Sequence, residues 1–124
     1  MQTLTESVVD IHPITQKTLD LFIERVKEHE GDNLLKIILF GSVARGEADK
    51  YSDIDVLVIL KDCHFKNKMD IWGINADVIL DMGFNENAYL QAMPMSEESS
   101  AGLNYYALML NVNNEGVVLY DTAQ

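Results

Sequence analysis

The sequence predicts an α+β fold in which a small mixed β-sheet is flanked by helices. Short apolar runs that suit buried strands are interspersed with longer stretches of helical periodicity. The chain has 124 residues, of which 48% are hydrophobic, and this suits one domain with its own core. We expect that single domain over residues 14–124, after a loose lead-in over residues 1–13.

The first half of the chain predicts one long helix and two strands. Apolar residues recur at helical spacing from Leu19 to Val26, which predicts an amphipathic helix from Ile14 to about His29. After it we expect a buried strand over Leu34–Phe40, a short helix from Ser42 to Gly46, and a second buried strand over Ile54–Leu60. The two strands therefore frame a short polar segment.

The second half predicts a third strand, two helices and a last strand. The run Ile74–Met82 predicts a strand with Asp77 near its start. Helices are expected over Asn85–Met93 and from Ser96, a plausible N-cap, to about Leu110. A turn then leads to a short strand over Val117–Tyr120.

Composition narrows the classes of function. Nine basic residues against twenty acids give a net charge of −11, so a nucleic-acid backbone is not an expected ligand. This charge is compatible with a small substrate carried with metal ions, or with a basic protein partner. No apolar run is long enough to span a membrane, and we see no signal peptide. A single cysteine, Cys63, excludes an internal disulfide, and we expect a cytoplasmic protein.

The segment between the first two strands carries the chemistry. It follows the first strand with Gly41 and Ser42 and enters the second strand with Asp53 and Asp55, in the run ILFGSVARGEADKYSDIDVLVIL. Backbone N–H groups at the start of a helix favour an anion, and a glycine lets a phosphate approach the backbone closely. The Ser42 hydroxyl adds a hydrogen-bond donor.

Two acids two residues apart on a strand point to the same face. Asp53 and Asp55 would repel each other there, and a divalent cation such as Mg²⁺ removes that penalty. Together with the anion cradle, the pair predicts a nucleoside triphosphate site with two metal ions. Asp77 on the next expected strand is the preferred third ligand or general base, and Asp81, in the same strand phase, is left as an alternative.

This pattern resembles the signature of the DNA polymerase beta-type nucleotidyltransferase superfamily, in which Gly-Ser is followed after ten residues by Asp-x-Asp in an apolar strand. The minimal nucleotidyltransferase (MNT) branch is the most similar. The resemblance is strong from Leu34 to about Leu80, and the tail EGVVLY extends it. It implies the nucleotidyltransferase fold and Mg²⁺-dependent transfer of a nucleoside monophosphate, usually from ATP, to a hydroxyl.

The resemblance also implies roles by position. Gly41 and Ser42 would hold the triphosphate, and Asp53, Asp55 and Asp77 would be the catalytic metal ligands. Arg45, in the short helix, would pair with phosphate or with an acid, and a structural salt bridge is an equal alternative for it.

Many minimal members resemble antitoxins that silence a HEPN-type RNase toxin by adding AMP to one of its tyrosines. The resemblance thus implies a HEPN-type partner and a tyrosine acceptor for this chain. Two alternatives stay open: an antitoxin that neutralises its partner by docking alone, and a nucleotidyltransferase for small molecules. Whether the chain forms oligomers, and which nucleotide it prefers, are not predicted.

Two further features have alternative explanations. Trp72, the only tryptophan, would either stack on a base or pack in the fold, and packing is the preferred explanation. Tyr105, Tyr106 and Met109 suit the core better than a partner-docking face.

Overall fold

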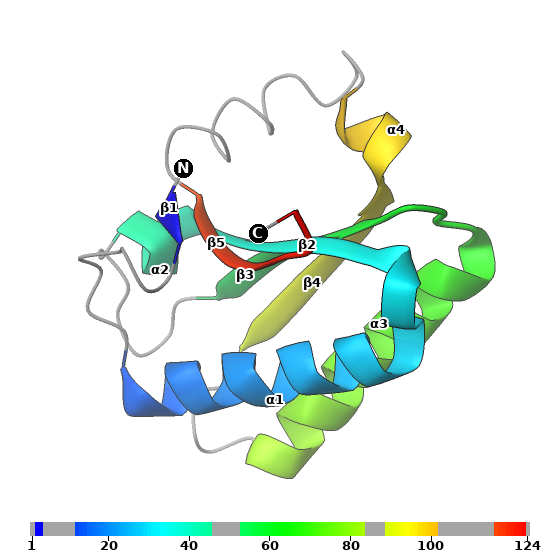
Figure 1. Cartoon of the computed structure of the whole chain (residues 1–124). Helices are drawn as coiled ribbons and strands as arrows, with labels where there is room; N and C mark the ends of the chain where they lie inside the picture. The colour runs from blue at the N-terminus through cyan, green and yellow to red at the C-terminus, as the bar shows by residue number, and fades with distance from the viewer. Residues whose placement is uncertain (1, 4–11, 46–52, 84–88, 102–115, 124) are drawn as a thin grey trace.

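The computed structural model of the chain describes residues 2–3, 12–45, 53–83, 89–101 and 116–123 (Figure 1). It contains a five-stranded mixed sheet with strand order β1-β5-β2-β3-β4. The strands are β1 (Gln2–Thr3), β2 (Leu34–Phe40), β3 (Ile54–Leu60), β4 (Leu90–Ser96) and β5 (Val117–Asp121). The α-helices are α1 (Pro13–Glu30), α2 (Gly41–Arg45), α3 (Phe65–Met82) and α4 (Glu97–Ser100), and a 3₁₀ turn spans Gly31–Asn33. The predicted α+β class with a mixed sheet is confirmed.

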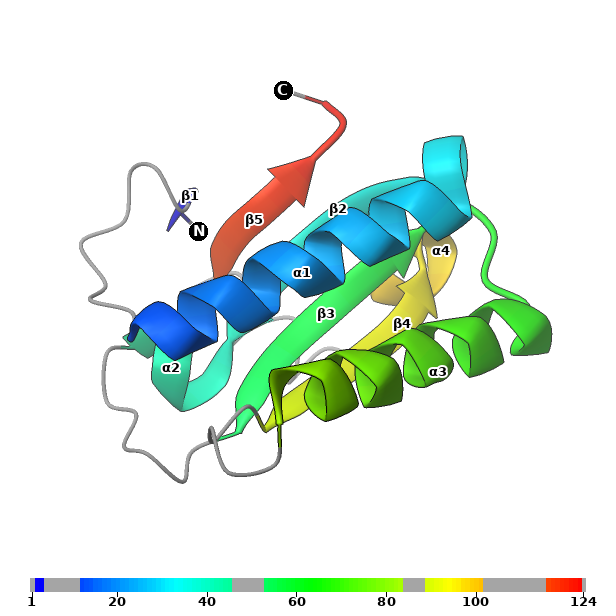
Figure 2. The same cartoon turned by 90° about the horizontal axis from the view of Figure 1, so that it is seen from below.

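The two long helices cover one face of the sheet. Figures 1 and 2 show α1 and α3 side by side against the same face. The main core lies between these helices and the sheet, and includes Leu19, Phe22, Val26, Ile37, Leu39, Val56, Val58, Ile71 and Val78. A smaller apolar cluster of Ile38, Leu57, Ile59 and Met95 lies on the other face. Within the described residues, no helix combines the length and apolar character needed to cross a bilayer.

The predicted first helix is confirmed as α1. His12 precedes it, and the His12 Nδ1 atom accepts a hydrogen bond from the Ile14 N–H at 3.1 Å. Pro13 occupies the first turn, where its missing N–H costs nothing. Gly31 ends the helix with a φ of 55°, a conformation that favours glycine.

Strand pairing places three residues in one row across the sheet. β2 and β3 are antiparallel, with Phe40 opposite Asp55. β3 and β4 are parallel, with Asp55 opposite Gln91, and α3 makes the crossover between them. The row Phe40–Asp55–Gln91 therefore crosses β2, β3 and β4 at the beginning of β3, directly before the β2–α2 junction.

The predicted strand over Ile74–Met82 is wrong, because this segment is the second half of α3. Ile71, Ile74 and Val78 recur at helical spacing and pack against the main core. The helix begins upstream, where His64 and Asn67 form a capping box. The run from Ile74 to Met82 also alternates, so a short window cannot separate the two periods, whereas the 18-residue window that starts at Phe65 favours a helix.

The predicted helix over Asn85–Met93 is also wrong where the structure describes it. Leu90–Ser96 forms β4, paired along its length with β3, while residues 84–88 lie outside the described part. Leu, Gln, Ala and Met favour helices, but parallel pairing with the buried strand β3 overrides that preference. Pro94, which suits an edge strand better than a helix, is the signal that could have identified β4.

The remaining elements confirm part of the prediction. Ser96 caps α4, its Oγ accepting from the Ser99 N–H at 3.0 Å, while the rest of the helix expected to Leu110 lies outside the described residues. The last strand is one residue longer than predicted. Within the expected lead-in, Gln2 and Thr3 form β1 and pair in parallel with β5, so these two residues belong to the sheet.

Gly73 offers a direct test of α3 as a helix through this region. A Cβ atom at Gly73 would have no neighbour within 4 Å, and the residue lies inside the helix. We expect Gly73→Ala to raise the free energy of unfolding by about 0.5–1 kcal/mol, because alanine loses less backbone entropy in a helix. Urea unfolding measures this. The matched change Ala76→Gly, at an exposed site on the same helix, should lower stability by a similar amount. A loss of stability in Gly73→Ala would contradict the helix.

Candidate active site

The β2–α2 junction brings Gly41 against the carboxylate of Asp55. Gly41 has a φ of 77°, and a Cβ atom built there would lie 2.5 Å from Asp55 Oδ2. Because Phe40 pairs with Asp55, the residue that follows β2 is carried directly past the Asp55 side chain. Only a glycine leaves this space open, so the sequence-predicted Gly41 and Asp55 are brought together.

Asp53 and Asp55 flank the first residue of β3. Asp53 stands exposed immediately before the strand, and Asp55 is half-buried within it. Ile54, between them, is buried in the main core on the helix-covered face. Leu57, two residues beyond Asp55, belongs to the cluster on the other face. Strand alternation therefore places Asp55 on the face away from α1 and α3.

The helix expected after Gly-Ser is confirmed, and it begins one residue earlier than predicted. Gly41–Arg45 is α2, so Ser42 and Arg45 lie on the helix that follows the Gly41 approach. The positions of the Ser42 and Arg45 side chains lie outside what the structure describes. Their predicted roles therefore stay predictions.

The structure places Asp77 away from the strand position on which its predicted role rested. Asp77 is exposed on α3, and the alternative Asp81 is also on α3, where it pairs with Arg25 of α1. Among the residues that the structure describes, no group of three His, Cys, Asp or Glu side chains is placed to hold a metal ion. An acid on a helix of the covering layer does not lie in the row of Asp55, so the strand position predicted for Asp77 is wrong, while its predicted role stays a prediction.

Gln91 occupies the place that the sequence analysis gave to a third acid. It is opposite Asp55 on the neighbouring parallel strand β4. Asn75 of α3 secures the backbone on both sides of Gln91: its Nδ2 donates to the Leu90 carbonyl at 3.0 Å, and its Oδ1 accepts from the Ala92 N–H at 2.8 Å. Sequence reasoning missed Gln91 because it placed this segment in a helix, and no charge marked the position.

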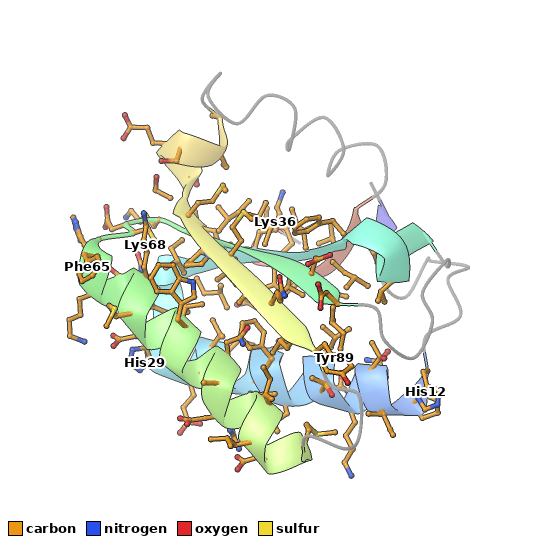
Figure 3. The ribbon with its side chains drawn as sticks, turned by 180° about the vertical axis from the view of Figure 1, so that it is seen from behind. His12, His29, Lys36, Phe65, Lys68 and Tyr89 are labelled. Carbon is orange, nitrogen blue, oxygen red and sulfur yellow. The ribbon has the colours of Figure 1, made fainter. Side chains whose placement is uncertain are left out.

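A pocket borders Asp55 and the edge strand β4. It has a volume of about 310 Å³, and its lining includes Phe40, Asp55, Gln91 and Met93 from the sheet and Lys68 and Trp72 from α3. Figure 3 shows Lys68 leaving α3 on the side that faces β4. Trp72, for which packing in the fold was the preferred explanation, lies on α3, and 47% of its surface is exposed. The pocket combines a carboxylate, an amide, an ammonium group and apolar walls.

Charged groups elsewhere on α3 belong to the framework. Asp70 Oδ2 lies 2.7 Å from Lys66 Nζ and 2.9 Å from Nε2 of His29 on α1. The hydrogen bonds with Lys66 and His29 hold the pKa of Asp70 below its ordinary value. Burial raises the pKa of the Cys63 thiol, so the single cysteine carries little of the nucleophilic thiolate at neutral pH.

Comparison with protein families and relatives points to one class of enzyme. Residues 19–109 match the nucleotidyltransferase domain family. Two proteins of Methanocaldococcus jannaschii, provisionally named protein adenylyltransferases, are similar in sequence. One is 33% identical over 105 residues, which cover 85% of this chain and 97% of the relative. The other is 46% identical over 63 residues, which cover 51% of this chain and 42% of the relative, so the matched part spans less than half of that protein.

Solved structures share the fold. A toxin–antitoxin complex with AMP-PNP aligns with a TM-score of 0.57 at 22% identity, covering 82% of this chain and 72% of the matched chain. A complex of a tri-AMPylated Shewanella oneidensis HEPN toxin with its MNT antitoxin aligns with a TM-score of 0.55 at 22% identity, covering 89% and 75%. At these identities the likeness concerns the fold, and it confirms the expected nucleotidyltransferase architecture.

Proposed function

The chain belongs to the nucleotidyltransferase domain family, and from this premise we propose that it moves AMP from ATP to a hydroxyl group on a protein. The observation that carries the proposal is the approach of Gly41 to the Asp55 carboxylate, with Asp53 two residues away. An open backbone position beside paired carboxylates suits a polyphosphate that is bound together with a divalent cation. The similarity to provisionally named protein adenylyltransferases supports AMP as the transferred group.

The residues present fit a divalent cation through two carboxylates. Asp53 and Asp55 would hold Mg²⁺, which suits oxygen ligands and takes further ones from substrate phosphates. When bound, the ion would neutralise the acids and polarise the reacting phosphate. This chain contributes a glycine that leaves room beside Asp55, and an amide, Gln91, next to it. The reaction requires ATP, which is consistent with the predicted cytoplasmic location.

The proposed partner is a HEPN-type protein, and the proposed acceptor is a tyrosine of that protein. A structurally similar antitoxin is bound to a HEPN toxin that carries AMP groups, which supports this choice. The strongly acidic composition of this chain, with a net charge of −11, suits a basic partner. The chain would then act as an antitoxin through covalent modification of its partner.

Transfer of a labelled AMP group tests the proposal. The chain and the protein encoded beside its gene would be incubated with ATP labelled at the α-phosphate and with Mg²⁺. We expect label in the partner, release of pyrophosphate, and loss of both in Asp53→Asn. Chelation of the metal by EDTA should stop the reaction in the wild type, because two carboxylates without a cation repel each other and the substrate phosphates.

Two results would contradict this function. If Asp53→Asn neutralises the partner completely and no label is transferred by either protein, the chain is an antitoxin that acts by docking. If label appears in a small hydroxyl compound and never in protein, the chain is a small-molecule nucleotidyltransferase. Retention of Mg²⁺-dependent transfer in Asp53→Asn would remove the metal-ligand role from that residue.

A further inference from the structure

The outward side of α3 differs from that of its neighbour α1. Both helices cover the same face of the sheet, and Figure 2 shows α3 at the outer edge of this layer. Beyond Pro13, the exposed residues of α1 are all polar: Lys17, Asp20, Glu24, Lys27, Glu28 and His29. On α3 the exposed residues include Phe65, Met69, Trp72, Gly73, Ala76 and Leu80. A surface helix normally carries polar residues opposite the core, so the apolar outward side of α3 indicates a further contact.

These six residues of α3, which we call the outer stripe, form one continuous band. With 3.6 residues per turn, they fall within about 100° of the helix circumference. The band lies roughly opposite Ile71, Ile74 and Val78, which pack against the main core. Its four largest side chains are well exposed, at 72% for Phe65, 52% for Met69, 47% for Trp72 and 57% for Leu80.

The outer stripe is symmetric along the helix. Its spacings from Phe65 to Leu80 are four, three, one, three and four residues. A two-fold axis between Trp72 and Gly73 would therefore superpose the levels of the stripe on those of a second, antiparallel copy. At two of the three levels a large side chain would be matched with a small one, which lets two helices approach closely. The levels pair Phe65 with Leu80, Met69 with Ala76, and Trp72 with Gly73.

The charges beside the outer stripe follow an unusual order along α3. The helix has no acid in its first turn, which contains Lys66, and no base in its last turn, which contains Asp81. A helix is stabilised by the reverse order, with acids near its N-terminus and bases near its C-terminus. α1 has the favourable basic residue, Lys27, in its last turn. The ion pair of Lys66 with Asp70 leaves 83% of the Lys66 side chain exposed.

An antiparallel second copy would make these charges favourable. With the two-fold axis between Trp72 and Gly73, Lys66 lies at the level between Asp77 and Asp81 of the second copy. These charged residues share one flank of the stripe, and an antiparallel two-fold pair brings equal flanks together. A parallel pair would instead bring the two basic ends together and the two acidic ends together. The charge pattern is therefore complementary to itself, which favours a second copy over an unrelated protein.

We propose that the chain associates as a two-fold symmetric dimer, in which the outer stripes of two α3 helices pack antiparallel. This property goes beyond the proposed transferase function and does not depend on it. The helix has 18 residues and is about 27 Å long, so the interface is small. Each copy carries a net charge of −11, whose repulsion is screened beyond about 8 Å at physiological salt. We expect a dissociation constant of about 1–100 μM in physiological salt.

Sedimentation velocity of the full chain at rising concentration, in physiological salt, tests the dimer. We expect the wild type to pass from monomer to dimer, and Met69→Glu, which places an acid within the stripe, to stay monomeric. Met93→Glu, at an exposed methionine of β4, should associate like the wild type. A wild type that stays monomeric at about 1 mM overturns the proposal, as does a dimer of Met69→Glu. The proposal also fails if a monomeric wild type binds a different protein through the stripe.

Disulfide cross-linking tests the antiparallel order in a Cys63→Ser background, which removes the single native cysteine. Met69→Cys and Ala76→Cys chains should cross-link when they are mixed, because these positions share a level in the proposed dimer. Neither variant should cross-link to itself, since equal positions would lie about 10 Å apart along the axis and a disulfide needs Cα atoms within about 7 Å. A cross-link within either variant alone would contradict the antiparallel order. Absence of the mixed cross-link at concentrations where the wild type is dimeric would exclude the outer stripe as the interface.

Discussion

Asp55→Asn is expected to lower the rate of AMP transfer by about 10³-fold or more, because it removes a carboxylate from the centre of the proposed site. A bound metal ion lowers the free energy of the charged transition state by several kcal/mol. Each 1.36 kcal/mol of activation free energy corresponds to a tenfold change in rate. Asp55 is also the residue that Gly41 approaches. Its loss should therefore also change the space in which we propose that the triphosphate binds.

Three asparagine variants test whether the site contains only Asp53 and Asp55 or also Asp77, which the sequence predicted as a third acid. Asp53→Asn should be as inactive as Asp55→Asn, whereas Asp77→Asn should keep the wild-type rate, because Asp77 lies exposed on α3. Thermal unfolding with and without Mg²⁺–ATP provides a second readout. The wild type and Asp77→Asn should be stabilised by the ligand, and Asp53→Asn and Asp55→Asn should not. An inactive Asp77→Asn would contradict this expectation and support the role that the sequence predicted for Asp77.

The strand–glycine–strand unit could be predicted from the sequence because its signals are local. Leu34–Phe40 and Ile54–Leu60 are apolar runs bounded by polar segments, and the structure contains both strands with these bounds. The position of Gly41 also follows from local sequence. Because β2 pairs with β3, the residue directly after β2 must pass close to the residues at the start of β3. The φ of 77° at Gly41 and the approach of this residue to Asp55 Oδ2 could not be predicted from the sequence.

The β4 side of the site could not be predicted in the same way. Its residues come from a helix and a strand that the sequence predicted the other way round. Ile74–Met82 is helical where a strand was predicted, and Leu90–Ser96 is extended where a helix was predicted. Both segments are short stretches that fit the helix period of 3.6 and the strand period of 2 about equally well. The pairing of β4 with β3, a contact between residues distant in sequence, decides the structure that forms. Gln91 carries no charge, so a search for acids passed over it.

Gly41→Ala tests whether the approach of the backbone to Asp55 is functional or only an accident of the turn. At a φ of 77° an alanine is strained, and its Cβ would lie 2.5 Å from Asp55 Oδ2. The carboxylate stands at the far end of the Asp55 side chain, so we expect the steric conflict to displace it at the expense of the site. We expect a loss of stability of about 1–2 kcal/mol from backbone strain, and a loss of transfer of about 10²-fold or more.

Gly31→Ala is the matched control for the strain. Gly31 also has a positive φ, of 55°, but a Cβ atom there would meet nothing within 4 Å, and the residue lies at the other end of β2. Gly31→Ala should therefore lose a similar amount of stability in urea unfolding while its transfer rate and its stabilisation by Mg²⁺–ATP stay at the wild-type level. If Gly41→Ala is equally destabilised yet transfers AMP at the wild-type rate, the space beside Asp55 is not where the triphosphate binds. If both variants lose activity in proportion to their stability, the effect belongs to folding. Only the selective loss in Gly41→Ala identifies the glycine as the residue that admits the substrate to the carboxylates.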